Sequence, residues 1–229
     1  MNLSEVGPVR EEPVGEEPVG GEVVGVHVVE HPLAKSMLAA LRDRSTPPPL
    51  FRLLAKRLAL VLCLEATRVI RTAPVEVETP LAKTTGVRIA KSLVAVPVLR
   101  AGLGMLEAVT ELFPEVSVGY VGLERDHATF EPSLYYSKLP PLGGCAALLL
   151  DPMLATGGSA CAACDALEKA GAEEITLLSV VSAPEGIARL QRLHPRVGIV
   201  TASIDDGLDQ DAYIVPGLGD FGDRLFGTL

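Results

Sequence analysis

The sequence predicts an α/β protein in which a doubly wound parallel sheet carries an N-terminal helical layer and a C-terminal hood at residues 213–223. Short apolar segments alternate with helical segments between residues 93 and 201, as in chains built from repeated strand–helix units. Hydrophobic residues make up 48% of the chain and aromatic residues only 4%, so the core must be aliphatic, which suits parallel strands covered on both faces. A glycine-rich turn also joins an apolar segment to a helix near residue 155. In such sheets, ligands bind beyond the carboxyl ends of the strands.

The first 22 residues differ in composition from the rest of the chain. The sequence Glu-Glu-Pro-Val-Gly occurs twice in succession over residues 11–20, and this segment has almost nothing to bury. We therefore expect a disordered acidic tail at residues 1–22 and a single domain at residues 23–229, since a chain of this length suits one core.

Hydrophobic periodicity places the elements in order. A valine-rich strand is expected at residues 23–29. Two helices follow, at residues 31–44 and from about Leu50 to Val61, with three prolines between them and leucines at helical spacing. The remaining elements alternate, with strands at residues 93–99, 116–123, 146–150, 175–181 and 198–201, and helices that begin near Gly102 and span residues 159–170 and 184–193. A long polar segment separates the second and third of these strands.

The charge of the chain argues against several classes of partner. The formal net charge is −9 and the lysines and arginines are scattered, so we expect binding neither to nucleic acid nor to an anionic membrane. No apolar run reaches the ~18–20 residues that span a bilayer, and no basic flank with an apolar stretch marks the N-terminus for secretion. Four cysteines in a chain of this size fit reduced thiols, and together these features predict a cytoplasmic protein. A small anionic substrate is still compatible, because the field in a pocket depends on nearby groups.

The most informative segment, which we call the phosphate turn, spans residues 151–159 and reads Asp-Pro-Met-Leu-Ala-Thr-Gly-Gly-Ser. It follows an apolar strand and opens a helix. Glycines allow the backbone to approach an anion closely, and the first N–H groups of a helix point outward without partners. The residues alone leave two interpretations open, a phosphate site or an ordinary capped strand–helix turn, because Ser and Thr are also common helix caps. A P-loop is excluded, since no lysine follows the glycines.

The phosphate turn resembles the 5-phosphoribosyl 1-diphosphate motif of the type I phosphoribosyltransferases. Most members carry two adjacent acids there, whereas Asp151-Pro152 is typical of the uracil branch and leaves Asp151 as the motif carboxylate for the ribose hydroxyls. Three further segments resemble the same branch. Residues 97–105 are similar to its pyrophosphate loop, residues 125–138 to its flap, and the hood to its base-binding segment. The resemblance covers residues 31–228, and leaves only the tail unmatched.

The resemblance implies the type I phosphoribosyltransferase fold and an enzyme, a pentosyltransferase that joins uracil to the phosphoribosyl donor to give UMP and pyrophosphate. It implies Arg100, Arg125 and Asp220 as catalytic residues. The donor-binding residues that it implies are Arg100, Arg125, Asp151, Pro152, Met153, Leu154, Ala155, Thr156, Gly157, Gly158, Ser159 and Asp220. The uracil-binding residues that it implies are Ile214, Gly219, Asp220 and Phe221, with the base read largely through main-chain groups. A Mg²⁺ cofactor would be held mainly through the donor diphosphate rather than by protein ligands, and a homo-oligomer is expected.

Some residues depart from the family pattern or suggest other chemistry. Glu124 and His127, at the start of the flap, stand where an aromatic residue and an acid often occur. His127 has two interpretations, a general base or a solvated loop histidine. Cys161 and Cys164 have the spacing of half a zinc site or of a redox pair, but the sequence has no matching second pair, which favours small core residues.

Two rival functions would use the same fold. A non-catalytic regulator that binds RNA would need a basic face, and a filter-binding assay with RNA would reveal it. A purine or orotate transferase would need a different base site, and both Pro152 and the hood sequence argue against it.

Overall fold

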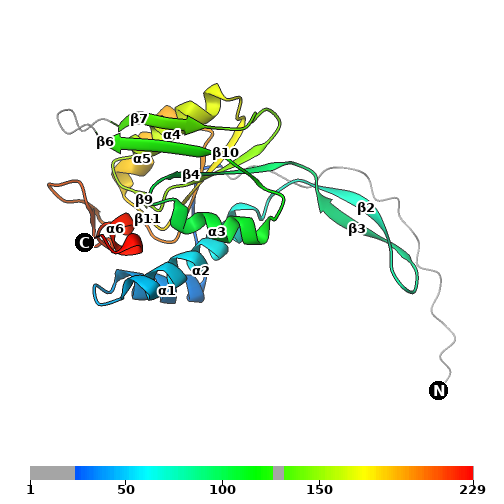
Figure 1. Ribbon diagram of the computed structural model, residues 1–229, viewed down its shortest axis with the longest axis horizontal. Helices are drawn as coiled ribbons and strands as arrows, with labels where there is room; N and C mark the ends of the chain where they lie inside the picture. Colours follow the sequence, from blue (N-terminus) through cyan, green and yellow to red (C-terminus); the bar gives the residue numbers. More distant parts are fainter. Residues whose placement is uncertain (1–23, 126–131, 229) are drawn as a thin grey trace, which may run out of the picture.

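A computed structural model describes residues 24–125 and 132–228. Its central sheet has the strand order β1-β12-β10-β8-β4-β6-β7, with β5 paired to β4 beside this path (Figure 1). Neighbouring strands are parallel, except that β7 is antiparallel to β6. The strands are β1 (Val26–Val28), β4 (Leu93–Leu99), β5 (Ser117–Val118), β6 (Tyr120–Arg125), β7 (Pro132–Lys138), β8 (Ala146–Leu150), β10 (Glu174–Ser179) and β12 (Gly198–Thr201).

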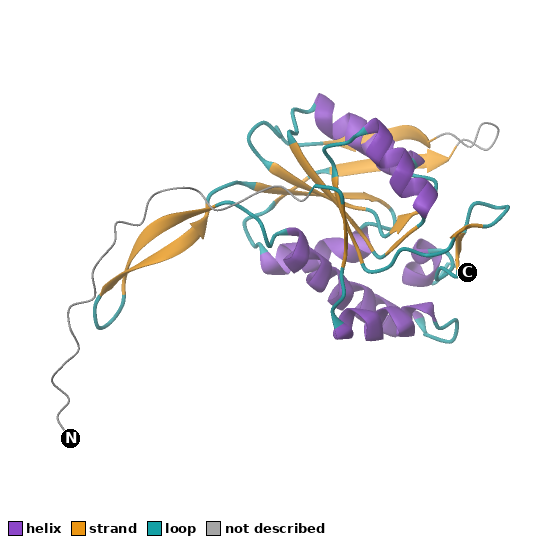
Figure 2. Cartoon of the chain, turned by 180° about the vertical axis from the view of Figure 1, so that it is seen from behind, coloured by secondary structure: helices purple, strands orange, loops and turns teal. Residues whose placement is uncertain are grey.

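Helices cover both faces of this sheet, as Figures 1 and 2 show. One face carries α1 (Pro32–Arg42), α2 (Pro48–Ala66), α3 (Leu103–Leu112) and the short α6 (Phe221–Phe226), and the other carries α4 (Gly158–Lys169) and α5 (Pro184–Leu193). The predicted doubly wound sheet with an N-terminal helical layer is therefore confirmed. Within the described ranges, none of the helices combines the length and the apolar character required to cross a bilayer.

The buried strands show why this architecture forms. Side chains alternate across a strand, so Leu93 and Ala95 of β4 join the core on the α2 side, while Val94 and Val96 join the core on the α4 side. A continuous apolar run of this kind is stable only when both faces of the sheet are covered. The alternating strand–helix pattern in the sequence supplies those covers on the two sides.

The two longest antiparallel hairpins of the described residues were not predicted from the sequence patterns. The first, β2 (Thr72–Glu78) with β3 (Lys83–Ile89), extends away from the sheet and its helices (Figures 1 and 2). Most of its side chains are exposed, including that of Val87 at 74%, so the alternating valines and glutamates of residues 75–78 do not mark a buried face. The second is formed by β6 and β7, and β7 lies in the predicted polar segment.

The strand expected at residues 116–123 is divided into β5 and β6, with Gly119 between them. The N–H of Gly119 donates to the carbonyl of Ala95 at 2.9 Å, so the chain stays attached to β4 across the break. Further along β6, a Cβ on Gly122 would come within 2.6 Å of the Tyr135 ring, so this ring of β7 lies directly over the glycine. Such an aromatic residue opposite a strand glycine fills the space that the glycine leaves.

Candidate functional site

The phosphate turn and the predicted pyrophosphate loop lie beside each other at the carboxyl edge of the sheet. Strands β4 and β8 are parallel neighbours with Pro97 opposite Leu150, so the loops that follow them start at the same edge. A Cβ on Gly102 would lie 2.3 Å from the carbonyl oxygen of Leu150, so only glycine fits at this contact. The structure thus places the predicted pyrophosphate loop directly against the end of β8, one residue before the phosphate turn begins.

Part of the phosphate turn is anchored through its backbone. Its strand β9 (Met153–Leu154) pairs with β11 (Val181–Ser182). The N–H of Leu154 donates to the Ser179 hydroxyl at 3.2 Å, and its carbonyl accepts the Ala183 N–H at 2.8 Å. The carbonyl of Pro152 accepts the N–H groups of residues 180 and 181. Pro152 and Leu154 therefore fix the position of the turn, because their backbone groups form hydrogen bonds within the chain.

The second part of the turn has its donors free. Gly157 has φ 75° at the N-terminal end of α4, and a Cβ there would lie 2.8 Å from the Gly186 carbonyl. Within the described residues, no acceptor is bonded to the N–H groups of Thr156, Gly157 and Ser159. Unpaired N–H groups at a helix N-terminus, together with the helix dipole, attract an anion. This geometry favours the phosphate interpretation over a turn capped by its own side chains.

Asp151 is a buried carboxyl group at the start of the turn, with 8% of its surface exposed. Its Oδ1 accepts a long hydrogen bond of 3.5 Å from the Met153 N–H. Burial raises the pKa of Asp151 to about 6, and the single hydrogen bond only partly offsets this effect. Among the described residues it forms no ion pair, so its oxygens keep acceptor capacity for a ligand.

The phosphate turn and the hood share one cavity of about 240 Å³. The turn contributes Met153 and Ala155, and the hood and the residues before it contribute the opposite wall. The lining residues are Met153, Ala155, Asp211, Ala212, Tyr213, Ile214, Gly219, Asp220 and Phe221. All the residues that the resemblance implied for uracil thus line the same cavity as part of the predicted donor site.

The hood, together with the residues that flank it, forms a small sheet and a short helix. Strand β14 (Ile214–Val215) pairs with β13 (Gly207–Leu208), and α6 follows the glycine-rich segment. Asp220 caps α6, since its Oδ1 accepts the Asp223 N–H at 2.8 Å. Phe221 is 1% exposed, and its ring meets that of Phe51 edge to face at 5.2 Å. The Asp220 side chain is thus held by α6, and Asp220 is one of the residues that line the cavity.

The two predicted catalytic arginines differ in what the structure describes. Arg100 is exposed, and its guanidinium carbon lies 5.8 Å from the centre of the Phe226 ring at the end of α6. Arg125 ends β6, a parallel neighbour of β4, so its backbone lies at the carboxyl edge of the sheet. The Arg125 side chain, residues 126–131 with His127, and the tail at residues 1–22 lie outside the described residues. Arg100 is thus placed near the hood, and Arg125 stays a prediction.

Sequence reasoning missed three polar residues that hold the hood, namely Arg42, Asp205 and Arg224. Burial would raise the pKa of Asp205, but hydrogen bonds from Arg42, Ser203 and the Gly217 N–H outweigh it and hold this pKa below its usual value. Burial lowers the pKa of Arg224. The one signal in the sequence was the segment Thr-Ala-Ser-Ile-Asp at residues 201–205, which carries Asp205 but does not reveal its partner.

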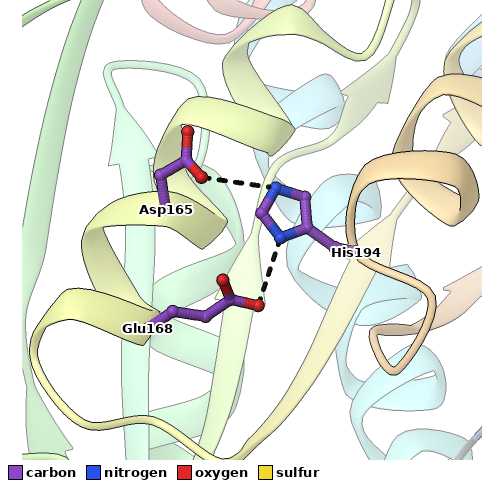
Figure 3. A group of neighbouring side chains, drawn as sticks. All are labelled: Asp165, Glu168 and His194. Atoms are coloured by element: carbon purple, nitrogen blue, oxygen red, sulfur yellow. Dashed lines mark hydrogen bonds and ion pairs between the residues drawn. The ribbon is translucent and has the colours of Figure 1, made fainter.

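One group of side chains away from the cavity has metal-ligand chemistry. We call Asp165, Glu168 and His194 the α4–α5 cluster (Figure 3). Nδ1 of His194 lies 3.1 Å from Glu168, and Nε2 lies 3.7 Å from Asp165. The two ring nitrogens thus face different carboxylates, which fits a hydrogen-bonded bridge between the helices better than a metal site, because one ion takes one nitrogen of a ring.

The two cysteines with paired spacing belong to the core. Cys161 and Cys164 are free thiols on the face of α4 that packs against the sheet. Burial raises the pKa of both thiols. The interpretation as small core residues is confirmed, since a buried neutral thiol is a poor nucleophile and a poor metal ligand.

Comparisons with known proteins agree with this geometry. A family model described as uracil phosphoribosyltransferase matches residues 28–228. The uracil phosphoribosyltransferase of Symbiobacterium thermophilum is 47% identical over 203 residues, which are 88% of this chain and 97% of that protein. The one of Leifsonia xyli subsp. xyli is 48% identical over 206 residues, covering 88% of this chain and 98% of that protein.

A solved structure gives the same result for the fold. The AQ2163 protein from Aquifex aeolicus is similar with a TM-score of 0.84 and 35% sequence identity, over 88% of this chain and 97% of that chain. The family predicted from the phosphate turn and the hood is confirmed by the family model and by both relatives. The chain belongs to the uracil phosphoribosyltransferase family.

Proposed function

We propose that the chain transfers the 5-phosphoribosyl group from 5-phosphoribosyl 1-diphosphate to N1 of uracil, which gives UMP and pyrophosphate. Family membership supports the reaction. The observation that carries the proposal is the cavity of about 240 Å³ with the phosphate turn on one side and the hood on the other. The donor would bind on the side of the phosphate turn and the pyrimidine base on the side of the hood.

The phosphate turn would bind the 5′-phosphate of the donor. Its free N–H groups at residues 156, 157 and 159, and the hydroxyls of Thr156 and Ser159, supply donors where the positive end of the α4 dipole lies. Asp151 would accept hydrogen bonds from the ribose hydroxyls. Its burial supports this role, since a carboxylate without a cationic partner is stabilised by such donors.

The hood would hold the base. Ile214, Gly219 and Phe221 line the cavity, and their main-chain donors and acceptors would match a uracil edge with alternating carbonyl and N–H groups. Asp220, whose side chain caps α6, would lie near N1 and the ribose. Holding N1 in line with the bond that breaks converts an encounter of two substrates into a reaction within one complex.

In the reaction, the bond from ribose C1 to the diphosphate oxygen breaks, the bond from C1 to uracil N1 forms, and N1 releases its proton to the solvent. Positive charge grows on the ribose ring while negative charge grows on the leaving pyrophosphate. Arg100 and Arg125 would stabilise the pyrophosphate, since charged donors placed where charge develops lower the barrier. The flap at residues 125–138 would exclude water, which otherwise hydrolyses the donor.

A Mg²⁺ ion fits the residues at this edge of the sheet. Asp151 and Asp220 offer hard oxygen atoms, and Mg²⁺ commonly takes one or two carboxylates and completes its shell with substrate phosphates and water. When bound, the ion would neutralise part of the diphosphate charge. The donor diphosphate would be its main ligand, with the two carboxylates nearby.

The proposal is tested by incubating the purified chain with labelled uracil, the phosphoribosyl donor and Mg²⁺. UMP should form, whereas cytosine, hypoxanthine and orotate should give little product. Efficient use of orotate or hypoxanthine would contradict the assignment of the base site. RNA retained on a filter by the chain, without UMP synthesis, would favour the regulator instead.

The cellular setting belongs to the same proposal. A homo-oligomer in the cytoplasm is expected for an enzyme of base salvage in this family. Sedimentation analysis of the purified chain and fractionation of cells test the two statements separately.

A further inference from the structure

The hood is held by the carboxyl end of α1, far from it in the sequence. Gly217 is bonded at both of its backbone polar groups. Its N–H donates to Asp205 Oδ2 at 2.8 Å, and its carbonyl accepts Nη1 of Arg42 at 2.7 Å. The next carbonyl, that of Leu218, accepts Nη1 of Arg224 at 2.7 Å. Two consecutive residues of the hood are therefore bonded through their backbones to charged side chains.

Arg42 and Asp205 form the centre of this network. The guanidinium donates to both carboxylate oxygens at 2.6 Å, in the two-pronged geometry that makes such pairs strong. Ser203 completes the pair, because its hydroxyl donates to Asp205 Oδ1 at 2.7 Å and accepts from Arg42 Nη2 at 3.1 Å. Only 2% of the Asp205 side chain is exposed, compared with 25% for Arg42. The pair is thus shielded from water mainly on the carboxylate side.

Arg224 attaches the hood to the same end of α1. Its Nη1 also donates to the carbonyl of Leu41, and its Nη2 donates to that of Asp43 at 2.6 Å. These two carbonyls flank Arg42 in the sequence. Its guanidinium also lies 4.5 Å from the centre of the Phe51 ring of α2. Residues 41–43 therefore form one anchor that bonds the hood through two arginines.

The hood needs such an anchor because of its own composition. Gly217 has φ 56°, and a Cβ there would lie 2.1 Å from the Ile214 carbonyl, so the chain turns sharply between Ile214 and Gly219. A turn rich in glycine has large conformational freedom when nothing else restrains it. Main-chain recognition of a base, in contrast, needs amides held to within about half an ångström. The restraint must then come from outside the turn.

We propose that Arg42 and Asp205 are positioning residues for the uracil site, which rests on the function proposed above. Neither lines the cavity, so both act through the Gly217 peptide rather than on the base. The phosphate turn has contacts of its own with Ser179 and Gly186, on the other side of the cavity. Its partner strand β11 is bonded to residues 203 and 205 only through backbone groups, which substitutions of the Arg42 and Asp205 side chains leave in place. Loss of the pair should therefore impair the binding of uracil and leave that of the donor intact.

The experiment compares Arg42→Ala, Arg42→Lys and Asp205→Asn with the wild type, and uses Lys56→Met as a control. Lys56 pairs with Glu107 and Glu111 between α2 and α3, away from the hood. In the Ala and Asn variants, KM for uracil should rise by about 10–100-fold, the scale for a small misplacement of substrate. KM for the donor, measured at saturating uracil, should stay within about twofold of the wild-type value. Arg42→Lys should fall between, since one ammonium group cannot bond both carboxylate oxygens in parallel.

Hydrogen exchange supplies a readout that does not depend on activity. Amides of residues 206–219 should exchange faster in Arg42→Ala and Asp205→Asn, while those of α4 keep their wild-type rates. The double variant should be about as impaired as each single one, because the two residues form one unit. If Arg42→Ala does not fold, Arg42→Lys and Asp205→Asn still provide the comparison.

Three results would overturn the proposal. The first is a parallel rise of both KM values, which indicates general damage. The second is an unchanged KM for uracil together with faster exchange in the hood. The third is unchanged exchange in residues 206–219. A wild-type chain that makes no UMP would instead defeat the proposed function, while the exchange comparison would still report whether Arg42 and Asp205 hold the hood.

Discussion

Replacing Asp151 with asparagine should stabilise the folded chain at neutral pH while it weakens binding of the donor. Burial raises the pKa of Asp151 from 3.8 to about 6. At about 1.4 kcal/mol per pH unit, this shift corresponds to about 3 kcal/mol by which the fold disfavours the ionised carboxylate. Asparagine has nearly the same shape and no charge, so this cost disappears in the variant.

The pH dependence has a defined sign. The folded chain binds this proton more tightly than the unfolded chain, so the stability of the wild type falls as pH rises from about 4 to about 6 and then levels off. The stability gained by Asp151→Asn should therefore be near zero below pH 4, about half its final value at pH 5, and about 3 kcal/mol above pH 7. A constant offset from the new amide group would shift the whole curve without changing its slope.

Urea denaturation at fixed protein concentration, repeated from pH 4.5 to pH 8, measures this difference in the free energy of unfolding. Asp206→Asn is the matched control, because Asp206 is exposed and its variant should track the wild type at every pH. The same Asp151→Asn preparation should lose about 10–100-fold in kcat/KM for the donor, the scale of one hydrogen bond to a charged group. A difference in stability that does not change with pH would refute the reasoning, because the burial of Asp151 would then carry no cost of ionisation.

Four further outcomes follow from the same geometry. Arg100→Ala should lower kcat/KM, with a loss of about 2–4 kcal/mol of transition-state stabilisation. Arg57 is an exposed arginine on α2, and Arg57→Ala should not change kcat/KM. Equal rates for both variants would remove Arg100 from the mechanism. Gly157→Ala should destabilise the fold by at least about 1–2 kcal/mol in urea denaturation, because the residue has φ 75° and its new methyl group would press on the Gly186 carbonyl. With a thiol reagent, Cys145 should react quickly and Cys164 only as fast as the chain unfolds, since burial raises the Cys164 pKa; rapid loss of two or more thiols from the native chain would contradict this. EDTA should stop turnover and leave the melting temperature unchanged, with Mg²⁺ restoring activity; a lower melting temperature would instead indicate a structural ion at the α4–α5 cluster.

The central sheet could be predicted because its signal is local. Each of β4, β8 and β12 is a short apolar run with a turn behind it, and burial on both faces leaves that pattern in the sequence itself. The same reasoning predicts that ligands bind at the carboxyl edge of the sheet, and it locates the phosphate turn there from the sequence alone. The β2–β3 hairpin could not be found in this way, because most of its side chains are exposed and no buried stripe marks its strands.

The candidate site was predictable only in part. The motif identifies the residues of the phosphate turn, but it does not distinguish backbone groups bonded within the chain, such as those of Leu154, from free ones, such as the N–H of Thr156. That distinction depends on Ser179 and Ala183, which belong to the neighbouring strand and to the start of α5. The distinction depends on contacts between distant parts of the chain, so no pattern within a few residues of the sequence indicates it.

Arg42 shows the same limit more strongly, since 163 residues separate it from Asp205. In the sequence, it is one more basic residue in the last turn of a helix, where a positive charge is already favourable because of the helix dipole. The residues of the hood, however, indicate that it needs partners from outside the segment. A segment that binds a ligand through its backbone, and is rich in glycine, needs groups from elsewhere in the chain to hold that backbone in place. Its partners must therefore be sought elsewhere in the chain, among acids and arginines with no role in the motif, and Asp205 just before the hood meets that description.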